Sequence, residues 1–248
     1  MIQGIEVFRE YFHDFKDQYV LIGGSACDLL FTEAGLDFRA TKDLDLVLIV
    51  EALTPEFGRQ FWSFISDGGY QHRSRSDGNP QYYRFDKPRS RKYPFMIELF
   101  SRTAALIEEP DSAVIPIHVG DDVSSLSAIL LNEDYYQLLI DGKRIATDLV
   151  VLKPEYLIVF KVKAYLDIKD QREKAGLEPN DDVKKHLRDI LRLTVLLTGN
   201  ERPILPESIR ADIMHFISQY ELAPYDPAQL KLSITTEQFL EIMNDLFR

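Results

Sequence analysis

Asp43 and Asp45 stand two positions apart where a polar stretch gives way to an apolar run, residues 44–50. Successive side chains of a strand alternate between its faces, so both aspartates would point the same way, about 7 Å apart. Two carboxylates on one face repel each other unless a cation lies between them. Oxygen ligands of this kind suit Mg²⁺ or Mn²⁺. The pair therefore predicts a divalent metal site.

A second chemical signal is Gly23-Gly24-Ser25, which follows an apolar run at 19–22. A helical pattern begins at Ser25, and backbone N–H groups at the start of a helix bind anions. A glycine there leaves room for a phosphate to approach the backbone. A phosphate site and a carboxylate pair, one short helix apart, are the parts of a phosphoryl- or nucleotidyl-transfer site.

Each signal alone also has a structural explanation. Gly-Gly before a helix makes a tight turn. Ser25 is a good N-cap, with Asp28 in the capping-box position and Gly35 suited to the C′ position. An Asp-x-Asp pair arises by chance in a chain with 40 acidic residues. The sequence has no Walker A loop, no G-x-G-x-x-G fingerprint and no H-E-x-x-H spacing among its five histidines, so these other kinds of site are not indicated.

The elements that must position these residues follow from hydrophobic periodicity. Beyond the strands at 19–22 and 44–50 and the helix at 25–34, we expect strands at 81–85 and 95–100 and helices at 55–66, 155–169, 183–197, 207–220 and 236–246. Asp141-Gly142 predicts a hairpin turn between strands at 136–140 and 143–151 within a β-rich segment, 128–152. The predicted fold class is α/β (α+β), with a mixed sheet and flanking helices over 1–152 and a helical domain over 153–248.

Composition excludes several classes of protein. With 45% hydrophobic and 11% aromatic residues, the 248-residue chain is too apolar to be disordered. No apolar run approaches the roughly 20 residues of a membrane span, and residues 1–11 show no signal-peptide pattern. The single cysteine, Cys27, fits a reducing compartment, so we expect a cytoplasmic protein that does not bind membranes. The net charge of -11 argues against general binding to nucleic acid.

The charge is unevenly distributed along the chain. Residues 71–92 contain seven basic residues and only two acidic ones, Asp77 and Asp86. The basic residues are Arg73, Arg75, Arg84, Lys87, Arg89, Arg91 and Lys92. This basic loop, from Arg73 to Lys92, is either a solvated segment or an electropositive wall facing a phosphate-bearing ligand.

Residues 19–50 resemble the first motif of the nucleotidyltransferase superfamily. In other enzymes that use Asp-x-Asp, the aspartates follow a strand, whereas here the polar residues 39–42 precede them and the apolar run follows. The superfamily adds a third carboxylate on a neighbouring strand, and Glu98, the only acid in the apolar segment 94–100, is its counterpart. Many members carry Asp at that position. A strand-edge Glu98 facing water is the alternative interpretation.

The helical part resembles the AbiEii/AbiGii toxin branch of that superfamily. The likeness lies in residues 151–165, with Lys161 and Lys163 before Ala164, and in residues 185–190, which contain Asp189. By helix geometry Lys161 lies near the centre of an apolar stripe and Lys163 lies further round. Asp189 falls inside an apolar arc, where a carboxylate needs a partner. A buried salt bridge between two helices explains Lys161 and Asp189 equally well.

The resemblance implies a nucleotidyltransferase-like fold that moves a nucleotide from an NTP to a hydroxyl on RNA, a protein or a small molecule. Asp43, Asp45 and Glu98 would hold Mg²⁺ or Mn²⁺, while Gly23, Gly24, Ser25, Lys161 and Lys163 would bind the nucleotide and Asp189 would orient Lys161 or act as a base. The basic loop is a candidate surface for an RNA or protein acceptor, and a toxin of this branch acts beside an antitoxin. Two alternatives stay open. One is a retired fold that serves as a nucleotide-binding or protein-interaction module, and the other is a small-molecule nucleotidyltransferase.

Overall fold

The computed structural model describes residues 2–74, 80–101, 106–109, 112–116, 129–130 and 132–247; at 72–74, 80–83, 106–109 and 112–116 it describes the backbone alone. The chain divides into two units. The first comprises Met1–Val123 and Lys143–Leu152, and the second comprises Ser124–Gly142 and Lys153–Arg248. The single boundary expected at residue 152 would place residues 124–142 in the first unit. The structure instead groups Ser124–Gly142 with the helical second unit.

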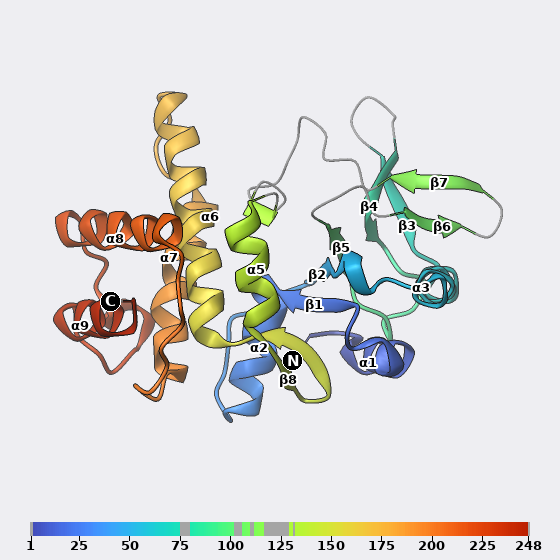
Figure 1. The fold of residues 1–248 in the computed structure, drawn as a ribbon, viewed down its shortest axis with the longest axis horizontal. Coiled ribbons are helices and arrows are strands. Elements are labelled where there is room, and N and C mark those ends of the chain that lie inside the picture. Colours follow the sequence, from blue (N-terminus) through green and yellow to red (C-terminus); the bar gives the residue numbers. More distant parts are fainter. Residues whose placement is uncertain are drawn as a thin grey trace. The chain divides into compact units, whose positions relative to one another are not determined.

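A mixed seven-stranded sheet forms the centre of the first unit, and the fold is mixed α/β (Figure 1). The strand order is β3-β4-β5-β2-β1-β9-β8, in which β2–β5 and β1–β9 are the parallel neighbours. The strands are β1 (Tyr19–Ile22), β2 (Asp43–Leu48), β3 (Gln71–Ser74), β4 (Pro80–Asp86), β5 (Met96–Phe100), β8 (Lys143–Ala146) and β9 (Leu149–Leu152). A separate hairpin pairs β6 (Leu106–Glu109) with β7 (Ser112–Pro116).

The helices of the first unit are α1 (Ile5–Phe12), α2 (Gly23–Glu33) and α3 (Pro55–Gly68), with short 3-10 turns at His13–Phe15 and Val50–Ala52. Aromatic rings of α1 and α3 pack together; Phe8 lies edge-on to Phe64, with ring centroids 5.8 Å apart. Every residue of β1 is buried, so this strand is covered on both faces. Five expected elements of this unit are confirmed, with small shifts of their ends: the strands at 19–22, 44–50, 81–85 and 95–100 and the helix at 55–66.

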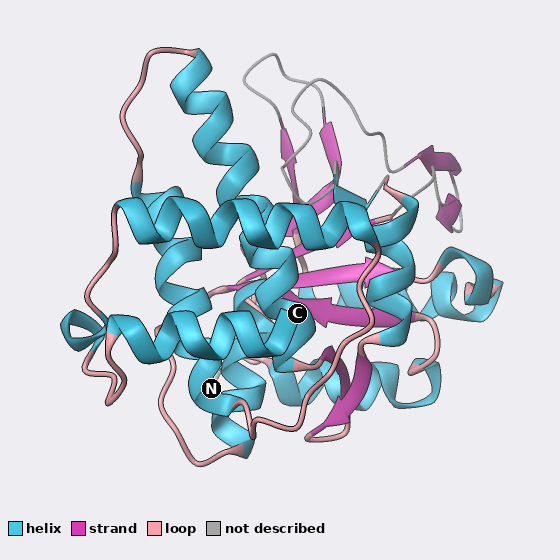
Figure 2. Cartoon of the chain, turned by 60° about the vertical axis from the view of Figure 1, so that its left-hand side comes forward, coloured by secondary structure: helices cyan, strands magenta, loops and turns pink. Residues whose placement is uncertain are grey.

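The second unit is helical, as the periodicity of residues 155–246 predicts. It contains α5 (Glu133–Asp141), α6 (Pro154–Lys174), α7 (Asp181–Leu193), α8 (Glu207–Leu222) and α9 (Thr236–Phe247), with 3-10 turns at Thr194–Leu196 and Pro227–Leu230. Helix α6 packs along α7 and against α8, and α8 also contacts α9 (Figures 1 and 2). In the described part of the chain, no helix combines the length and the apolar character needed to cross a bilayer.

The predicted hairpin around Asp141-Gly142 is wrong. Residues Glu133–Asp141 form α5 because the Asn132 side chain accepts hydrogen bonds from Asp134 N and Tyr135 N at the helix start. Gly142 then ends the helix, where a Cβ atom would lie 2.5 Å from the Tyr156 ring. Close helix packing, not a hairpin turn, explains this glycine.

The hairpin of this region lies one element later, between β8 and β9. Its two turn residues, Thr147 and Asp148, have φ angles of 47° and 66°. Two consecutive residues with positive φ define a type I′ turn, for which Asn-Gly is the usual sequence. The turn was missed because Thr-Asp carries none of that signal, and Thr147, a β-branched residue, is strained in this conformation.

Thr147→Asn is expected to raise the free energy of unfolding by about 1 kcal/mol, because asparagine tolerates the left-handed region far better than threonine. Chemical denaturation measures the change. The hydroxyl of Thr147 is buried without a hydrogen-bond partner among the described residues. An equal gain from Thr147→Val, which keeps the β-branch, would show that this hydroxyl and not the backbone is the source.

Candidate functional site

Three charged side chains form a row across neighbouring strands of the sheet. In the register of the sheet, Arg84 on β4 lies opposite Glu98 on β5, and Glu98 lies opposite Asp45 on β2. Cross-strand partners point to the same face of a sheet, and Asp43, two residues before Asp45, shares that face. The register therefore brings the three predicted carboxylates to one face of adjacent strands, with an arginine beside them.

The backbone at Gly23 lies directly against the Asp45 carboxylate. Strand β1 ends at Ile22, which pairs with Asp45, and the chain turns into α2 at Gly23. Gly23 has a φ of 64°, and a Cβ atom there would lie 2.9 Å from the Asp45 Cγ and overlap the carboxylate itself. Glycine is thus needed twice at this position, for the left-handed backbone and for the space that Asp45 occupies.

Gly24 lies beneath two polar side chains that precede the aspartates. A Cβ atom at Gly24 would be 2.6 Å from the Thr41 hydroxyl and 3.4 Å from the Arg39 guanidinium. Both side chains are half-buried. An N-terminal turn of a helix, a hydroxyl and a guanidinium around one glycine form a cradle suited to a phosphate. Arg39 and Thr41 belong to the polar stretch that precedes the aspartates, and their approach to Gly24 was not predicted.

Ser25 has a different role from the predicted N-cap. Helix α2 begins at Gly23, two residues earlier than expected, and its N-cap, Ile22, makes no side-chain hydrogen bond. Ser25 is fully buried and donates its hydroxyl proton to the Ile22 carbonyl, at 2.8 Å. Serine inside a helix bonds back to an earlier carbonyl in this way. The backbone N–H groups of the first turn, Gly23, Gly24 and Ser25, have no partner within the helix and are the donors suited to an anion.

The other end of α2 agrees with the prediction. Gly35 has a φ of 70°, its N–H bonds to Thr32, and the N–H of Leu36 bonds to Phe31. This pair of bonds is the Schellman motif, with Gly35 at C′. These two hydrogen bonds fix the C-terminal end of α2, which lies between the glycine turn and the aspartates in the sequence.

Glu98 does not face water as the alternative interpretation supposed. Its side chain is 13% exposed and makes an ion pair with Arg84. A carboxylate at this depth needs a charged partner, and Arg84 supplies one. Asp43, Asp45 and Glu98 offer oxygen ligands of the kind that Mg²⁺ and Mn²⁺ prefer, and the register brings them to one face of the sheet. Among the described residues, the side chains as they stand form no group of three or more metal ligands.

In the second unit, Lys161 and Asp189 form the expected pair between α6 and α7. Lys161 Nζ lies 2.9 Å from Asp189 Oδ2, and both side chains are buried, at 6% and 0% exposure. Arg192 approaches the other carboxylate oxygen at 3.7 Å. The helical periodicity of the sequence correctly predicted that Asp189 has a partner inside the apolar arc.

Lys163 lies elsewhere on α6 and meets a different set of groups. Its ammonium is 3.1 Å from Asp167 and 3.4 Å from Asp212 on α8. Burial lowers the pKa of Lys163, but the two carboxylates outweigh it and the net pKa is raised. Tyr135 donates to Asp212 at 2.8 Å, which ties α5 into the same cluster. Lys161 and Lys163 are thus held by separate partners, as their different angles on the helix predict.

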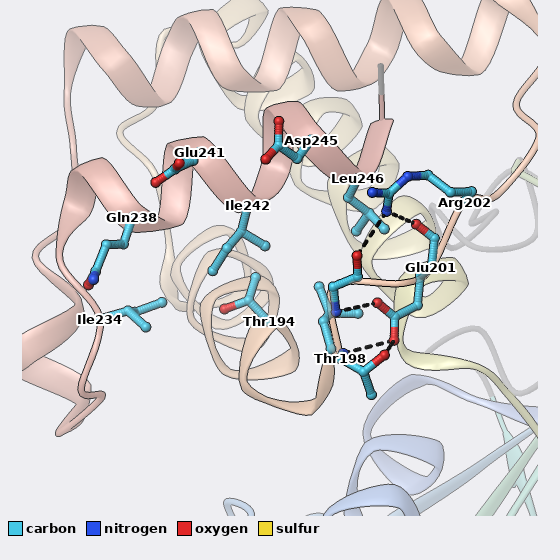
Figure 3. Close-up of a pocket in the computed structure, with 12 residues that line it drawn as sticks. Thr194, Thr198, Glu201, Arg202, Ile234, Gln238, Glu241, Ile242, Asp245 and Leu246 are labelled. Atoms are coloured by element: carbon cyan, nitrogen blue, oxygen red, sulfur yellow. Dashed lines mark hydrogen bonds between the residues drawn. The ribbon is translucent and has the colours of Figure 1, made fainter.

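A hollow of about 420 Å³ lies in the second unit beside α9 (Figure 3). Its polar groups largely satisfy one another. Glu201 accepts hydrogen bonds from Thr198 and from the Gly199 N–H, and Arg202 donates to the Gly199 carbonyl. The opposite wall carries the exposed acids Glu241 and Asp245. No group points to a particular ligand.

The basic loop lies only partly within the described residues. The side chains of Arg73 and Arg75 fall outside them, Arg84 pairs with Glu98, and the cations further along the loop are exposed: Lys87, Arg89, Arg91 and Lys92. At the start of β2, Lys42 lies 5.6 Å from the centre of the half-exposed Phe95 ring. Arg84 therefore belongs to the carboxylate row and not to a free cationic surface.

The fold and the carboxylate row define the class of protein as a mixed α/β protein with an acidic site at the start of a central strand. Compared with known proteins, the chain matches no protein-family model, no curated protein and no solved structure.

If the predicted metal and nucleotide site is formed here, Gly23→Ala is expected to leave a folded protein that does not bind nucleotide in the presence of metal. Alanine costs about 1–2 kcal/mol in the left-handed region, and its methyl group must displace the Asp45 carboxylate. Calorimetric titration of nucleotide and thermal unfolding measure the two effects.

Gly35→Ala is the matched control for Gly23→Ala. Gly35 has a similar φ of 70°, but a Cβ atom there meets nothing within 4 Å. The same backbone strain should therefore lower stability without touching binding. Equal binding by both variants would show that Gly23 does not support the site.

Proposed function

We propose that the protein is a metal-dependent nucleotidyltransferase that moves a nucleotide from an NTP to a hydroxyl acceptor. The observation that carries the proposal is the register of β1, β2 and β5. It pairs Asp45 with Glu98 and sets the Gly23 turn against Asp45. Two paired carboxylates next to the start of a helix combine a cation site with an anion site, which is what transfer of a phosphate-bearing group requires.

In this proposal one set of residues binds the metal ion and another binds the phosphates. Asp43, Asp45 and Glu98 would hold Mg²⁺ or Mn²⁺, which when bound neutralises phosphate charge and makes an acceptor hydroxyl more acidic. The first turn of α2, with Thr41 and Arg39 above Gly24, binds phosphate oxygens.

Roles for the second unit rest on the resemblance of its sequence to the AbiEii/AbiGii branch. By that resemblance, Lys161 and Lys163 of this chain would bind the nucleotide, and Asp189 would orient Lys161 or act as a base. The 2.9 Å pairing of Lys161 with Asp189 is compatible with such an orienting role. A Lys161 ammonium near a triphosphate would neutralise charge that builds on the leaving group. The acceptor remains a hydroxyl on RNA, a protein or a small molecule, and action as a toxin with an antitoxin is part of the proposal.

A second candidate function is a nucleotide-binding or interaction module that has lost catalysis. The Arg84–Glu98 ion pair favours it, because an arginine there engages the carboxylate that catalysis needs for metal. The retained row of Asp43, Asp45 and Glu98 favours the enzyme, since carboxylates on one face of adjacent strands are the oxygen ligands that Mg²⁺ prefers.

The test is calorimetric titration of the four NTPs into the full chain, first with Mg²⁺ and then with EDTA. Micromolar binding of one NTP that requires Mg²⁺ supports the proposal and names the donor. Glu241→Gln, which changes an exposed acid beside the hollow in the second unit, is the control and should bind equally. Transfer of labelled nucleotide to RNA, protein or small hydroxyl compounds then separates the enzyme from the module. Absence of binding under both conditions would contradict the enzyme and a nucleotide-binding module, and would leave an interaction module as the remaining function.

A further inference from the structure

Arg84 lies next to the carboxylate row and forms an ion pair with Glu98. Its guanidinium makes an ion pair with Oε1 of Glu98, and the two side chains are 27% and 13% exposed. Glu98 in turn lies opposite Asp45 in the register of β2 and β5. A protein cation therefore already contacts a carboxylate that the proposed function assigns to a metal ion.

The two cations have the same electrostatic task. Carboxylates directly opposite each other on adjacent strands repel, and partial burial strengthens the repulsion because the local dielectric constant is lower than that of water. Arg84 offsets the charge of Glu98 when no metal is present. A divalent ion between Asp45 and Glu98 would supply the same compensation, so the ion and the guanidinium compete for one carboxylate.

Arg84 also has a second class of partner. Guanidinium groups bind phosphate as readily as carboxylate, often through two parallel hydrogen bonds. The Arg84 side chain is partly exposed, so a ligand at the surface of the site can reach its guanidinium. The phosphates of a nucleotide can therefore replace Glu98 as the partner of Arg84, which leaves Glu98 able to bind the metal ion.

We propose that Arg84 is a positioning residue that competes with the divalent ion for Glu98, so that metal alone binds weakly and metal binds well only together with nucleotide. This inference rests on the proposed function and adds to it a coupling between the two ligands. The coupling is reciprocal, because whatever the nucleotide adds to metal affinity the metal must add to nucleotide affinity.

The test uses Mn²⁺ alone, titrated into the full chain and followed by electron paramagnetic resonance without nucleotide. Arg84→Gln is expected to tighten Mn²⁺ binding about tenfold, equivalent to about 1.4 kcal/mol. Arg84→Lys keeps the charge without the planar fork and should fall between the variant and the wild type. Arg59→Gln breaks another arginine–glutamate pair, the exposed one with Glu56 on α3, and should leave Mn²⁺ affinity unchanged.

A measurement on the unaltered chain covers the case in which Arg84→Gln fails to fold. The Arg84 Nε–Hε resonance, assigned with Arg84→Lys, should shift during a Mg²⁺ titration with the midpoint of Mg²⁺ binding. A resonance that does not move while Mg²⁺ binds would overturn the inference, as would an unchanged or weaker Mn²⁺ affinity in Arg84→Gln.

The outcomes separate this inference from the proposed function. If Mn²⁺ binds the wild type, is lost in Asp45→Asn and is unaffected by Arg84→Gln, only the role of Arg84 is wrong. If neither the wild type nor Arg84→Gln binds Mn²⁺, the metal site itself is wrong and the role of Arg84 falls with it.

Discussion

Asp45→Asn is expected to abolish Mg²⁺-dependent nucleotide binding, with a loss of at least about 100-fold, while the chain stays folded. The substitution keeps the shape of the side chain and removes one charged ligand, which matters because Mg²⁺ in such sites is bound through only one or two carboxylates together with phosphate oxygens. It also removes the repulsion between Asp45 and Glu98, which lie opposite each other across β2 and β5. The melting temperature should therefore stay the same or rise.

Calorimetric titration and thermal unfolding of the same preparation check both halves of this expectation. Asp170→Asn is a suitable control, since Asp170 is an exposed acid on α6 in the second unit, where it pairs with Lys174. It should bind nucleotide like the wild type. If Asp45→Asn unfolds the chain instead, the carboxylate has a structural role and the proposed site is wrong.

The local parts of the site could be predicted from the sequence because they depend on strand alternation and helix starts. Asp43 and Asp45 share a face once residues 43–48 form a strand, and the apolar run of that segment made the strand plain. The partner of Asp189 was predictable for the same reason, because an acid inside an apolar helical arc must be neutralised.

Arg84 was not predictable as part of the site. Its role depends on β4 pairing with β5 in a register that places Arg84 opposite Glu98, and sequence periodicity gives no information about register between distant segments. The same holds for Arg39 and Thr41, whose approach to Gly24 depends on how the 34–42 connection returns to the helix start.

One element was misassigned because a strong local signal had another use, and another element was missed. Asp141-Gly142 resembles a hairpin turn, but the burial of Tyr135, Leu138 and Leu139 at helical spacing, with an Asn cap before them, decided the conformation. The N-terminal α1 was not predicted at all, although its Ile5, Phe8 and Phe12 have the spacing of a buried helical face.

The buried pair of Lys161 and Asp189 leads to the second large effect. Lys161→Met is expected to lower the free energy of unfolding of the helical unit by about 3–5 kcal/mol, because it leaves the Asp189 charge buried and without its ammonium partner. Arg192, 3.7 Å from the other carboxylate oxygen, compensates only in part. Far-UV circular dichroism during chemical denaturation measures the loss.

The double variant Lys161→Met, Asp189→Leu is expected to recover most of that stability, since apolar side chains of similar volume replace the pair without leaving a charge. Lys163→Met, at the half-exposed position two residues along, should cost far less on its own. The double variant also separates structure from function. If it regains stability but no longer binds or transfers the nucleotide, Lys161 acts in the reaction. If it keeps full activity, the pair only joins α6 to α7, and the phosphate-neutralising charge must come from the first unit, where Arg39 approaches Gly24 and Arg84 contacts Glu98.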